Sequence, residues 1–387
     1  MKRTFKPHPI VVSRRQLVLS AASAALTSPL FARAAPGDSA DEILIGQSVP
    51  LSGPAAPSFE VLLRGQDLAL KEFNAKGGVN GRPVKVIKLD DGYDTRKCAD
   101  NVNKLIDEHK VVSLFGLGST AGVGATLPIL LEKKVPLIGV YTGSPSLRMK
   151  QHPYFFTTTA SYRDEVVQMI RNQVTLQRSR IGLVYSNNPF GQLMVPVVEE
   201  VAKEMGVAIV SRASLEITGT DALAAAQAVA KERPQAVIMM AFGTGIFPFI
   251  KAARSIIGAP LYCPSVANAK ALLDALGDDA RGLAYTVTIP FPWRQTSPLM
   301  REYNAAMEAA KLPVDYDHLT GYLNMRSLLA VIARVGKQIT PQGLVATAER
   351  MKKVDLGGYV LDFSPSNHHG SRFVETVVVG PGGRYMR

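Results

Sequence analysis

Two hydrophobic patterns alternate along the first third of this chain. Short, nearly continuous apolar runs predict four buried β-strands, at residues 43–46, 84–89, 111–115 and 136–140. Between them, residues 62–74 and 98–109 carry apolar side chains at helical spacing, and a further helix is expected before the fourth strand. Such alternation predicts a parallel sheet covered by helices on both faces.

The same rhythm restarts further along the chain. Strands are expected at residues 181–185, 207–212 and 236–241, with helices at 195–205 and 221–231 between them. Residues 155–159 and 282–291 lack helical spacing and predict extended crossovers, and a helix at 319–335 and a β-rich tail at 359–379 follow. The α/β pattern therefore predicts two doubly wound parallel-sheet lobes, joined by a chain that crosses several times and forms a hinge.

Length and charge agree with a folded, two-lobed protein. The 387 residues exceed one average domain, and 47% of them are hydrophobic. The net charge of +12 is concentrated at the start, where six basic residues precede the first acidic residue, Asp38. The remaining excess of +6 is too small for a nucleic-acid-binding surface, so no nucleic-acid partner is expected.

The first 34 residues have the features of an export signal. Arg14 and Arg15 precede an apolar stretch at 17–31, and small residues flank Arg33 in a pattern that signal peptidases accept. The arginine pair is similar to a twin-arginine signal, although the general secretory route stays open. We expect cleavage near Ala34, export to the periplasm and no lipid anchor, since no cysteine lies at the cleavage site.

Signatures of catalysis and of cofactor binding are missing from the sequence. There is no Gly-x-Ser-x-Gly motif and no Walker loop, and the glycines at 116–122 depart from the dinucleotide spacing. His368 and His369 predict a solvated turn rather than a metal site, and Cys98 and Cys263 are expected to be free thiols. We expect no enzyme activity, no cofactor and no metal.

Small polar residues follow three of the predicted strands, where doubly wound sheets bind their ligands. The candidate ligand-binding residues at these ends are Gly118, Ser119, Thr120, Tyr141, Thr142, Gly143, Ser144, Phe242, Gly243 and Thr244, together with Phe190. Hydroxyl groups beside a helix N-terminus can hold a carboxylate without a metal. Alternatively, the hydroxyls cap their own helix, the second segment is a plain β-turn, and the phenylalanines belong to the core.

Several motifs resemble the leucine/isoleucine/valine-binding family of periplasmic solute receptors for ABC importers. They are Ile45-Gly46 followed by residues 51–54, the segments 74–81, 90–94 and 185–191, and Ala252-Ala253-Arg254 with Gly258. The resemblance implies a type I periplasmic binding protein with three crossovers, a permease partner and no catalysis, and we expect a monomer. Lobe 1 would comprise residues 41–157 and 290–356, and lobe 2 residues 158–289 and 357–387.

The resemblance also assigns roles by position. Ser119 and Thr120 match carboxylate-binding serines, residues 141–143 match a second ligand loop, and Ser58 and Phe59 match an aromatic contact. Phe190 and Phe242 stand where relatives carry tyrosines.

Ser265 lies in the run where those relatives place a glutamate against the ligand's ammonium group. The implied ligand is a small carboxylate-bearing solute, and the missing glutamate favours an organic acid, aromatic acids included, over an α-amino acid. A sensor feeding a signalling partner and an exported hydrolase remain alternatives.

Overall fold

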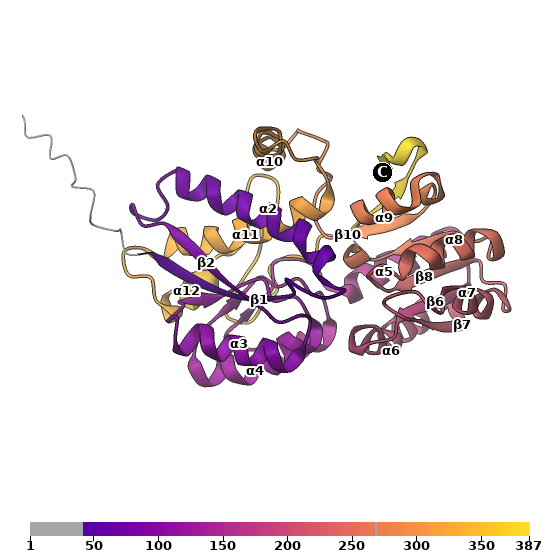
Figure 1. Cartoon of the computed structure of the whole chain (residues 1–387), viewed down its shortest axis with the longest axis horizontal. Coiled ribbons are helices and arrows are strands. Elements are labelled where there is room, and N and C mark those ends of the chain that lie inside the picture. Colours follow the sequence, from indigo (N-terminus) through magenta and orange to yellow (C-terminus); the bar gives the residue numbers. More distant parts are fainter. Residues whose placement is uncertain (1–41, 268) are drawn as a thin grey trace, which may run out of the picture. The chain divides into compact units, whose positions relative to one another are not determined.

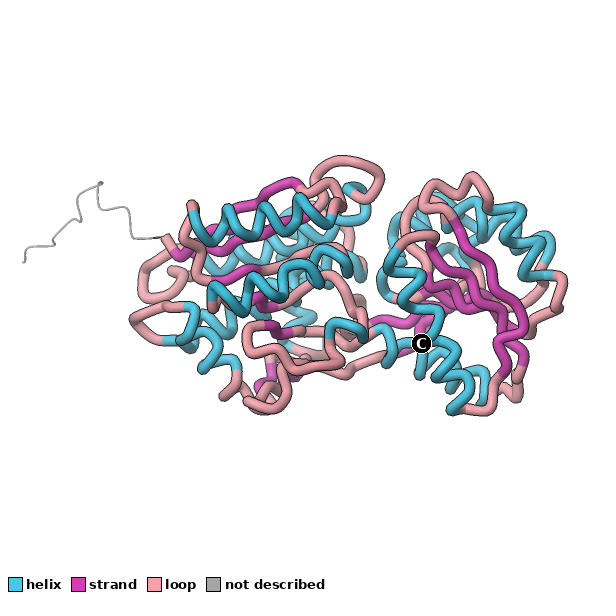
Figure 2. The backbone as a smooth tube through the Cα atoms, turned by 90° about the horizontal axis from the view of Figure 1, so that it is seen from below, coloured by secondary structure: helices cyan, strands magenta, loops and turns pink. Residues whose placement is uncertain are grey.

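The strands of the chain fall into two main sheets (Figure 2). The computed structural model describes residues 42–267 and 269–387, so the expected export signal at 1–34 lies outside the described residues. Within the described part, no helix is both long enough and apolar enough to span a membrane.

The first sheet is wholly parallel, with strand order β2-β1-β3-β4-β5. Its strands are β1 (Ile43–Val49), β2 (Val84–Asp90), β3 (Ser113–Leu114), β4 (Leu137–Ile138) and β5 (Phe155–Phe156). The helices associated with this sheet are α2 (Ala56–Ala75), α3 (Thr95–Asp107), α4 (Thr120–Lys133), α11 (Tyr316–Val335) and α12 (Pro341–Ala348). Figure 1 shows α2 and α11 on one face and α3 and α4 on the other, which is the predicted doubly wound arrangement.

The second sheet has the order β14-β13-β10-β9-β8-β6-β7. Its strands are β6 (Arg180–Ser186), β7 (Ala208–Leu215), β8 (Ala236–Met240), β9 (Leu261–Cys263), β10 (Ala284–Val287), β13 (Glu375–Val379) and β14 (Tyr385–Met386). The first five are parallel to one another, as expected, whereas β13 and β14 add an antiparallel edge. The helices that follow these strands or the crossovers are α5 (Tyr162–Thr175), α6 (Pro189–Glu204), α7 (Ala222–Ala230), α8 (Ile246–Ile256), α9 (Ala269–Leu276) and α10 (Pro298–Ala310).

Two glycines let α2 and α11 pack in direct backbone contact. A Cβ atom on Gly65 would lie 1.9 Å from the carbonyl oxygen of His318, and one on Gly321 would lie 1.8 Å from that of Leu62. Real Cβ atoms do not come that close to an oxygen, so this helix pair requires glycine at both positions. The contact fixes α11 over the first sheet.

Three crossovers connect the two sheets, and the last lies later than expected. β11 (Val354–Asp355) pairs with β12 (Val360–Leu361), and the ring of Phe363 packs 5.6 Å from that of Phe156. Residues 357–370 therefore stay with the first sheet, and the chain joins the second only at β13. The boundary expected at residue 357 is too early because the alternating pattern of the tail does not reveal which sheet it joins.

The crossovers also bond to one another. The amide of Thr157 in the first crossover donates to the carbonyl of His368, in the segment that leads into the third, at 2.9 Å. The hydroxyl of Tyr359 lies 2.7 Å from the carbonyl oxygen of Thr158 and 3.4 Å from that of Thr288, in the second crossover. These contacts join the first two crossovers to the segment that leads into the third.

Two smaller expectations have opposite outcomes. Cys98 and Cys263 are buried free thiols, as predicted. The expectation of a solvated turn is wrong for His368, which is 2% exposed and stacks on Phe156 at a ring distance of 3.8 Å. Within residues 42–267 and 269–387, no group of three or more His, Cys, Asp or Glu side chains is placed to hold a metal ion.

Candidate functional site

A pocket of about 90 Å³ lies where elements of both sheets meet. From the first sheet's side it is lined by Ser58, Phe59, Leu62, Tyr93, Gly118, Thr120, Val140, Tyr141, Thr142, Gly143, Asp317, Thr320 and Asn324. From the second sheet and the crossovers it is lined by Thr159, Ala160, Tyr162, Glu165, Phe190, Phe242, Ser265, Val266 and Thr288. Several of these residues follow the carboxyl ends of parallel strands, where doubly wound sheets bind ligands.

Most of the residues predicted as ligand-binding are brought together here. The pocket is lined by Ser58, Phe59, Gly118, Thr120, Tyr141, Thr142, Gly143, Phe190, Phe242 and Ser265, which come from six separate segments of the chain. Their binding role stays a prediction, but their convergence on one cavity is a property of the fold.

Four predicted residues do not line the pocket. Ser119 caps α4, since its Oγ accepts from the amide of Gly122 at 2.8 Å, as the capping alternative expects. Ser144 is buried and its Oγ lies 2.9 Å from that of Ser146. Gly243, in a left-handed conformation, packs on Ile217, and the hydroxyl of Thr244 lies 3.4 Å from the carbonyl oxygen of Ile217. These four residues support the loops around the pocket.

A pair of threonine hydroxyls forms a polar end of the pocket. The Oγ1 atoms of Thr120 and Thr142 lie 2.8 Å apart, and both residues are about 95% buried. Thr120 is the first residue of α4, so the pair lies at the positive end of that helix dipole. The arrangement suits an anionic group, because a hydroxyl can turn its hydrogen towards an incoming oxygen.

Aromatic rings form the walls of the pocket. Phe59 packs 6.3 Å from both Tyr93 and Tyr141 on the first sheet's side. Phe190 packs 5.7 Å from Phe242 on the other side, and the two groups meet where Tyr93 lies 5.5 Å from Phe242. Phe190 and Phe242 are buried in the core and also line the pocket, so the core interpretation and the pocket interpretation are compatible.

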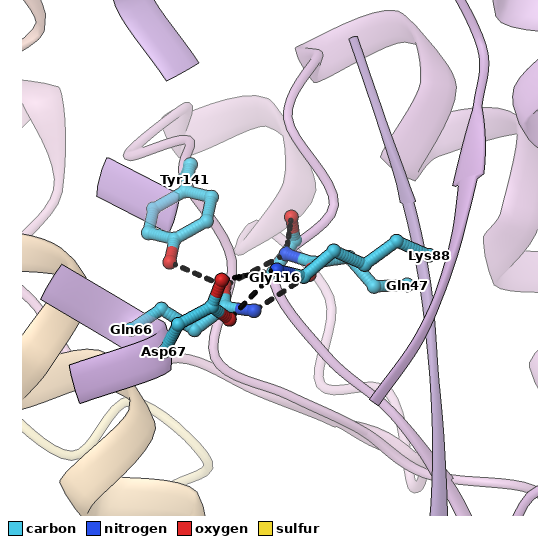
Figure 3. A network of polar contacts seen from close by, with 6 residues as sticks. All are labelled: Gln47, Gln66, Asp67, Lys88, Gly116 and Tyr141. Carbon is cyan, nitrogen blue, oxygen red and sulfur yellow. Dashed lines mark hydrogen bonds and ion pairs between the residues drawn. The ribbon is translucent and has the colours of Figure 1, made fainter. Parts of the chain in front are cut away.

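A buried glutamine pair positions Tyr141 (Figure 3). The side-chain amides of Gln47 and Gln66 bond to each other in both directions, at 3.0 and 2.8 Å. The hydroxyl of Tyr141 donates to Oε1 of Gln66 at 3.0 Å, and Gln47 also donates to the carbonyl of Gly116 at 3.1 Å. Burial raises the pKa of Tyr141 far above its usual value.

Glu165 is the main functional candidate that sequence reasoning missed. It is fully buried on α5, and its Oε2 accepts from the amide of Ser265 at 2.7 Å and from the hydroxyl of Thr286 at 2.6 Å. Its Oε1 accepts from the hydroxyl of Ser265 at 2.7 Å. Burial raises the pKa of Glu165 to about 7, against the opposing effect of these three donors.

The structure brings to Ser265 an acidic side chain that the sequence did not predict, while the nature of the ligand's polar group stays a prediction. The position of Ser265 carries no carboxylate, but α5 brings the carboxylate of Glu165 against it from a hundred residues earlier in the chain. Asp317, in the first turn of α11, is a second acidic residue among the described residues that line the pocket. The sequence signal nearest to Glu165 is the capping box of Ser161 and Asp164, which fixes the start of α5. It does not reveal which residues α5 packs against.

Comparisons with known proteins agree with this architecture. Residues 42–384 match the family model described as periplasmic binding protein. The chain is 27% identical to the solved structure of a possible leucine/isoleucine/valine-binding protein from Rhodopirellula baltica, with a TM-score of 0.83 over 90% of this chain and 97% of that one.

Two curated proteins are also similar. A Leu/Ile/Val-binding protein homolog of Brucella suis is 23% identical over 88% of this chain and 90% of its own length. An amino acid binding protein of Pseudomonas aeruginosa is 21% identical over 170 residues, and this match covers 45% of that protein. The family model covers nearly all of the described residues, and the chain therefore belongs to the periplasmic binding proteins of the leucine/isoleucine/valine-binding type.

Proposed function

We propose that this protein captures a small carboxylate-bearing solute, amino acid-like or an organic acid, and delivers it to the permease of an ABC importer. The observation that carries the proposal is the pocket between the two sheets, with a hydroxyl pair at the start of α4 and aromatic walls. Such a helix start favours an anion. The names of the Rhodopirellula baltica and Brucella suis relatives support a solute of this size.

The pocket residues suggest a two-step mode of binding. The solute's carboxylate would dock on the hydroxyls of Thr120 and Thr142, beside Gly118 and Gly143, whose lack of side chains admits the ligand. Closure about the three crossovers would then bring Phe190 and Phe242 over its apolar part. A solute stabilises the closed form only by its higher affinity for that form.

The remaining parts of the proposal concern location and partners. The protein would be exported, cleaved near Ala34 and act in the periplasm as a monomer, with the permease recognising the closed pair of lobes. Binding would involve no cofactor and no bond-making step, in keeping with a family of solute-binding proteins.

A ligand screen tests the proposal directly. Purified mature protein is heated with each of the proteinogenic amino acids and with aliphatic and aromatic carboxylic acids, and hits are measured by calorimetry. We expect a carboxylate compound to raise the unfolding temperature and to reduce the radius of gyration in small-angle scattering. A protein that ignores every compound, or that converts one chemically, would contradict the proposal.

A further inference from the structure

The described residues that line the pocket include acidic side chains but no basic ones. Its described lining includes the carboxylates of Glu165 and Asp317, and none of the lining residues is lysine, arginine or histidine. A solute that carried only a negative charge would therefore enter a cavity beside the carboxylate of Glu165. In a medium of low dielectric, two negative charges inside one cavity repel each other strongly.

The surroundings of Glu165 stabilise its charge only in part. Its hydrogen-bond partners among the described residues, Ser265 and Thr286, are neutral donors, and together they occupy three of about four acceptor positions on the carboxylate. The remaining acceptor position lies on Oε1. A buried carboxylate with neutral partners gains from an incoming cation more than an exposed one does.

Other titratable groups lie near Glu165. Arg148 is held by the carbonyl oxygens of Thr159 and Ala160, at 3.1 and 3.3 Å. Asp164 precedes Glu165 on α5 and adds negative charge near it.

The phenol of Tyr162 and the thiol of Cys263 are buried near it, and burial raises the pKa of both, so they stay neutral. Glu165 thus forms no ion pair among the described residues, although the buried guanidinium of Arg148 is near enough to attract it electrostatically.

We propose that Glu165 is the proton-linked counter-ion of the solute, an inference that rests on the proposed function. The captured solute carries a cationic group, and its binding expels a proton from the Glu165 carboxyl. Glu165 supplies this contact from α5, behind Ser265. The proton passes to the buffer, and the solute's cation takes its place beside the carboxylate, so charge is balanced in the cavity.

The linkage predicts a definite direction of pH dependence. The pKa of Glu165 lies at about 7 in the empty protein, and a bound cation lowers it. Affinity is then constant above about pH 8 and falls by up to about tenfold for each pH unit below 7. A solute that lacks a cation would raise the same pKa and bind more tightly as the pH falls.

Matched pairs of compounds test the inference. Leucine and 4-methylpentanoic acid, and phenylalanine and 3-phenylpropanoic acid, differ within each pair only in the ammonium group. Calorimetry at pH 5.5, 7.0 and 8.5, in two buffers of different ionisation enthalpy, gives both the affinity and the protons released. We expect the ammonium member of a pair to bind at least 30-fold more tightly at pH 8.5 and to release protons at pH 5.5.

Three variants separate the role of Glu165 from a general loss of fold. Glu165→Gln should weaken the ammonium member at least 30-fold at pH 8.5 without weakening its deaminated partner. Thr286→Val keeps the charge but removes one donor, so it should move the pH midpoint of binding upward. Glu200→Gln, on the exposed side of α6, should change neither.

The outcomes distinguish the two proposals. Tighter binding of the deaminated acids, with proton uptake and affinity that rises as the pH falls, would overturn the role of Glu165 and leave the proposed function intact. Equal binding by wild type and Glu165→Gln would do the same. If compounds of neither kind bind, the proposed function fails and the role of Glu165 fails with it.

Discussion

The hydroxyl of Tyr141 points away from the solute space and donates to Oε1 of Gln66 at 3.0 Å. Tyr141 therefore offers its ring to the pocket, while its polar atom belongs to the buried network behind the wall (Figure 3). Gln47 and Gln66 are both fully buried and bond to each other, so the residue that holds the Tyr141 hydroxyl is itself held by a residue outside the pocket lining.

Breaking the glutamine pair should destabilise the protein. Gln66→Leu leaves the buried carbonyl oxygen of Gln47 without its donor, and we expect a loss of about 1–3 kcal/mol in the free energy of unfolding. Tyr141→Phe removes only one bond and should cost about 1 kcal/mol or less. Urea unfolding measures both.

Asp67, the residue after Gln66 in the chain, provides a matched control for the glutamine variants. Asp67 pairs with Lys88 at 2.6 Å on the surface, and Asp67→Ala should cost under about 1 kcal/mol, because exposed ion pairs contribute little. If Asp67→Ala is as damaging as Gln66→Leu, the glutamine pair has no special part in stability.

The threonine pair should contribute to affinity rather than to stability. Thr120→Val and Thr142→Val each remove one hydroxyl from the polar end of the pocket, and we expect each to weaken a carboxylate solute about 5- to 10-fold. Calorimetry with the best ligand of the screen measures the change. Thr340→Val, at the N-cap of α12, should instead lower stability by about 1 kcal/mol and leave affinity unchanged. A normal affinity in both pocket variants would place the carboxylate elsewhere.

Gly321 should not tolerate a methyl group. Gly321→Ala forces α11 away from the carbonyl of Leu62, and we expect a loss of about 1–3 kcal/mol or more. Gly124, also within a helix, has its nearest neighbour at 3.6 Å, so Gly124→Ala should be neutral or should stabilise the protein by up to about 1 kcal/mol. Thermal unfolding compares the two, and equal effects would mean that the α2–α11 contact can relax.

Glu165 should make stability depend on pH. Burial raises its pKa from 4.5 to about 7, so the folded state holds a proton that the unfolded state has already lost between these values. Stability should fall as the pH rises through this window, by roughly 3 kcal/mol at most. Urea unfolding of the ligand-free protein between pH 4.5 and 8 should show this decline in wild type and a flatter curve in Glu165→Gln. Parallel curves would mean that the carboxylate is ionised throughout.

The two doubly wound sheets followed from the sequence because apolar runs and helical spacing are local patterns. The same holds for the strand-end residues, such as Thr120 and Thr142, which precede or follow predicted elements at recognisable positions. The edge strands were harder to predict. β13 enters the second sheet from the third crossover and pairs antiparallel with β10, on the side away from β9. Its own alternating residues do not encode that direction.

The chain by itself determined the architecture, the free thiols and most of the residues that surround the pocket, because each depends on residue type and on neighbours close in sequence. The tertiary structure alone decided which acidic side chain faces Ser265. Glu165 reads in sequence as one more charged residue in the first turn of a helix, and only the packing of α5 against β10 removes it from water and places it behind the cavity. A buried charge is set by what surrounds it in space, so spacing along the chain could not reveal it.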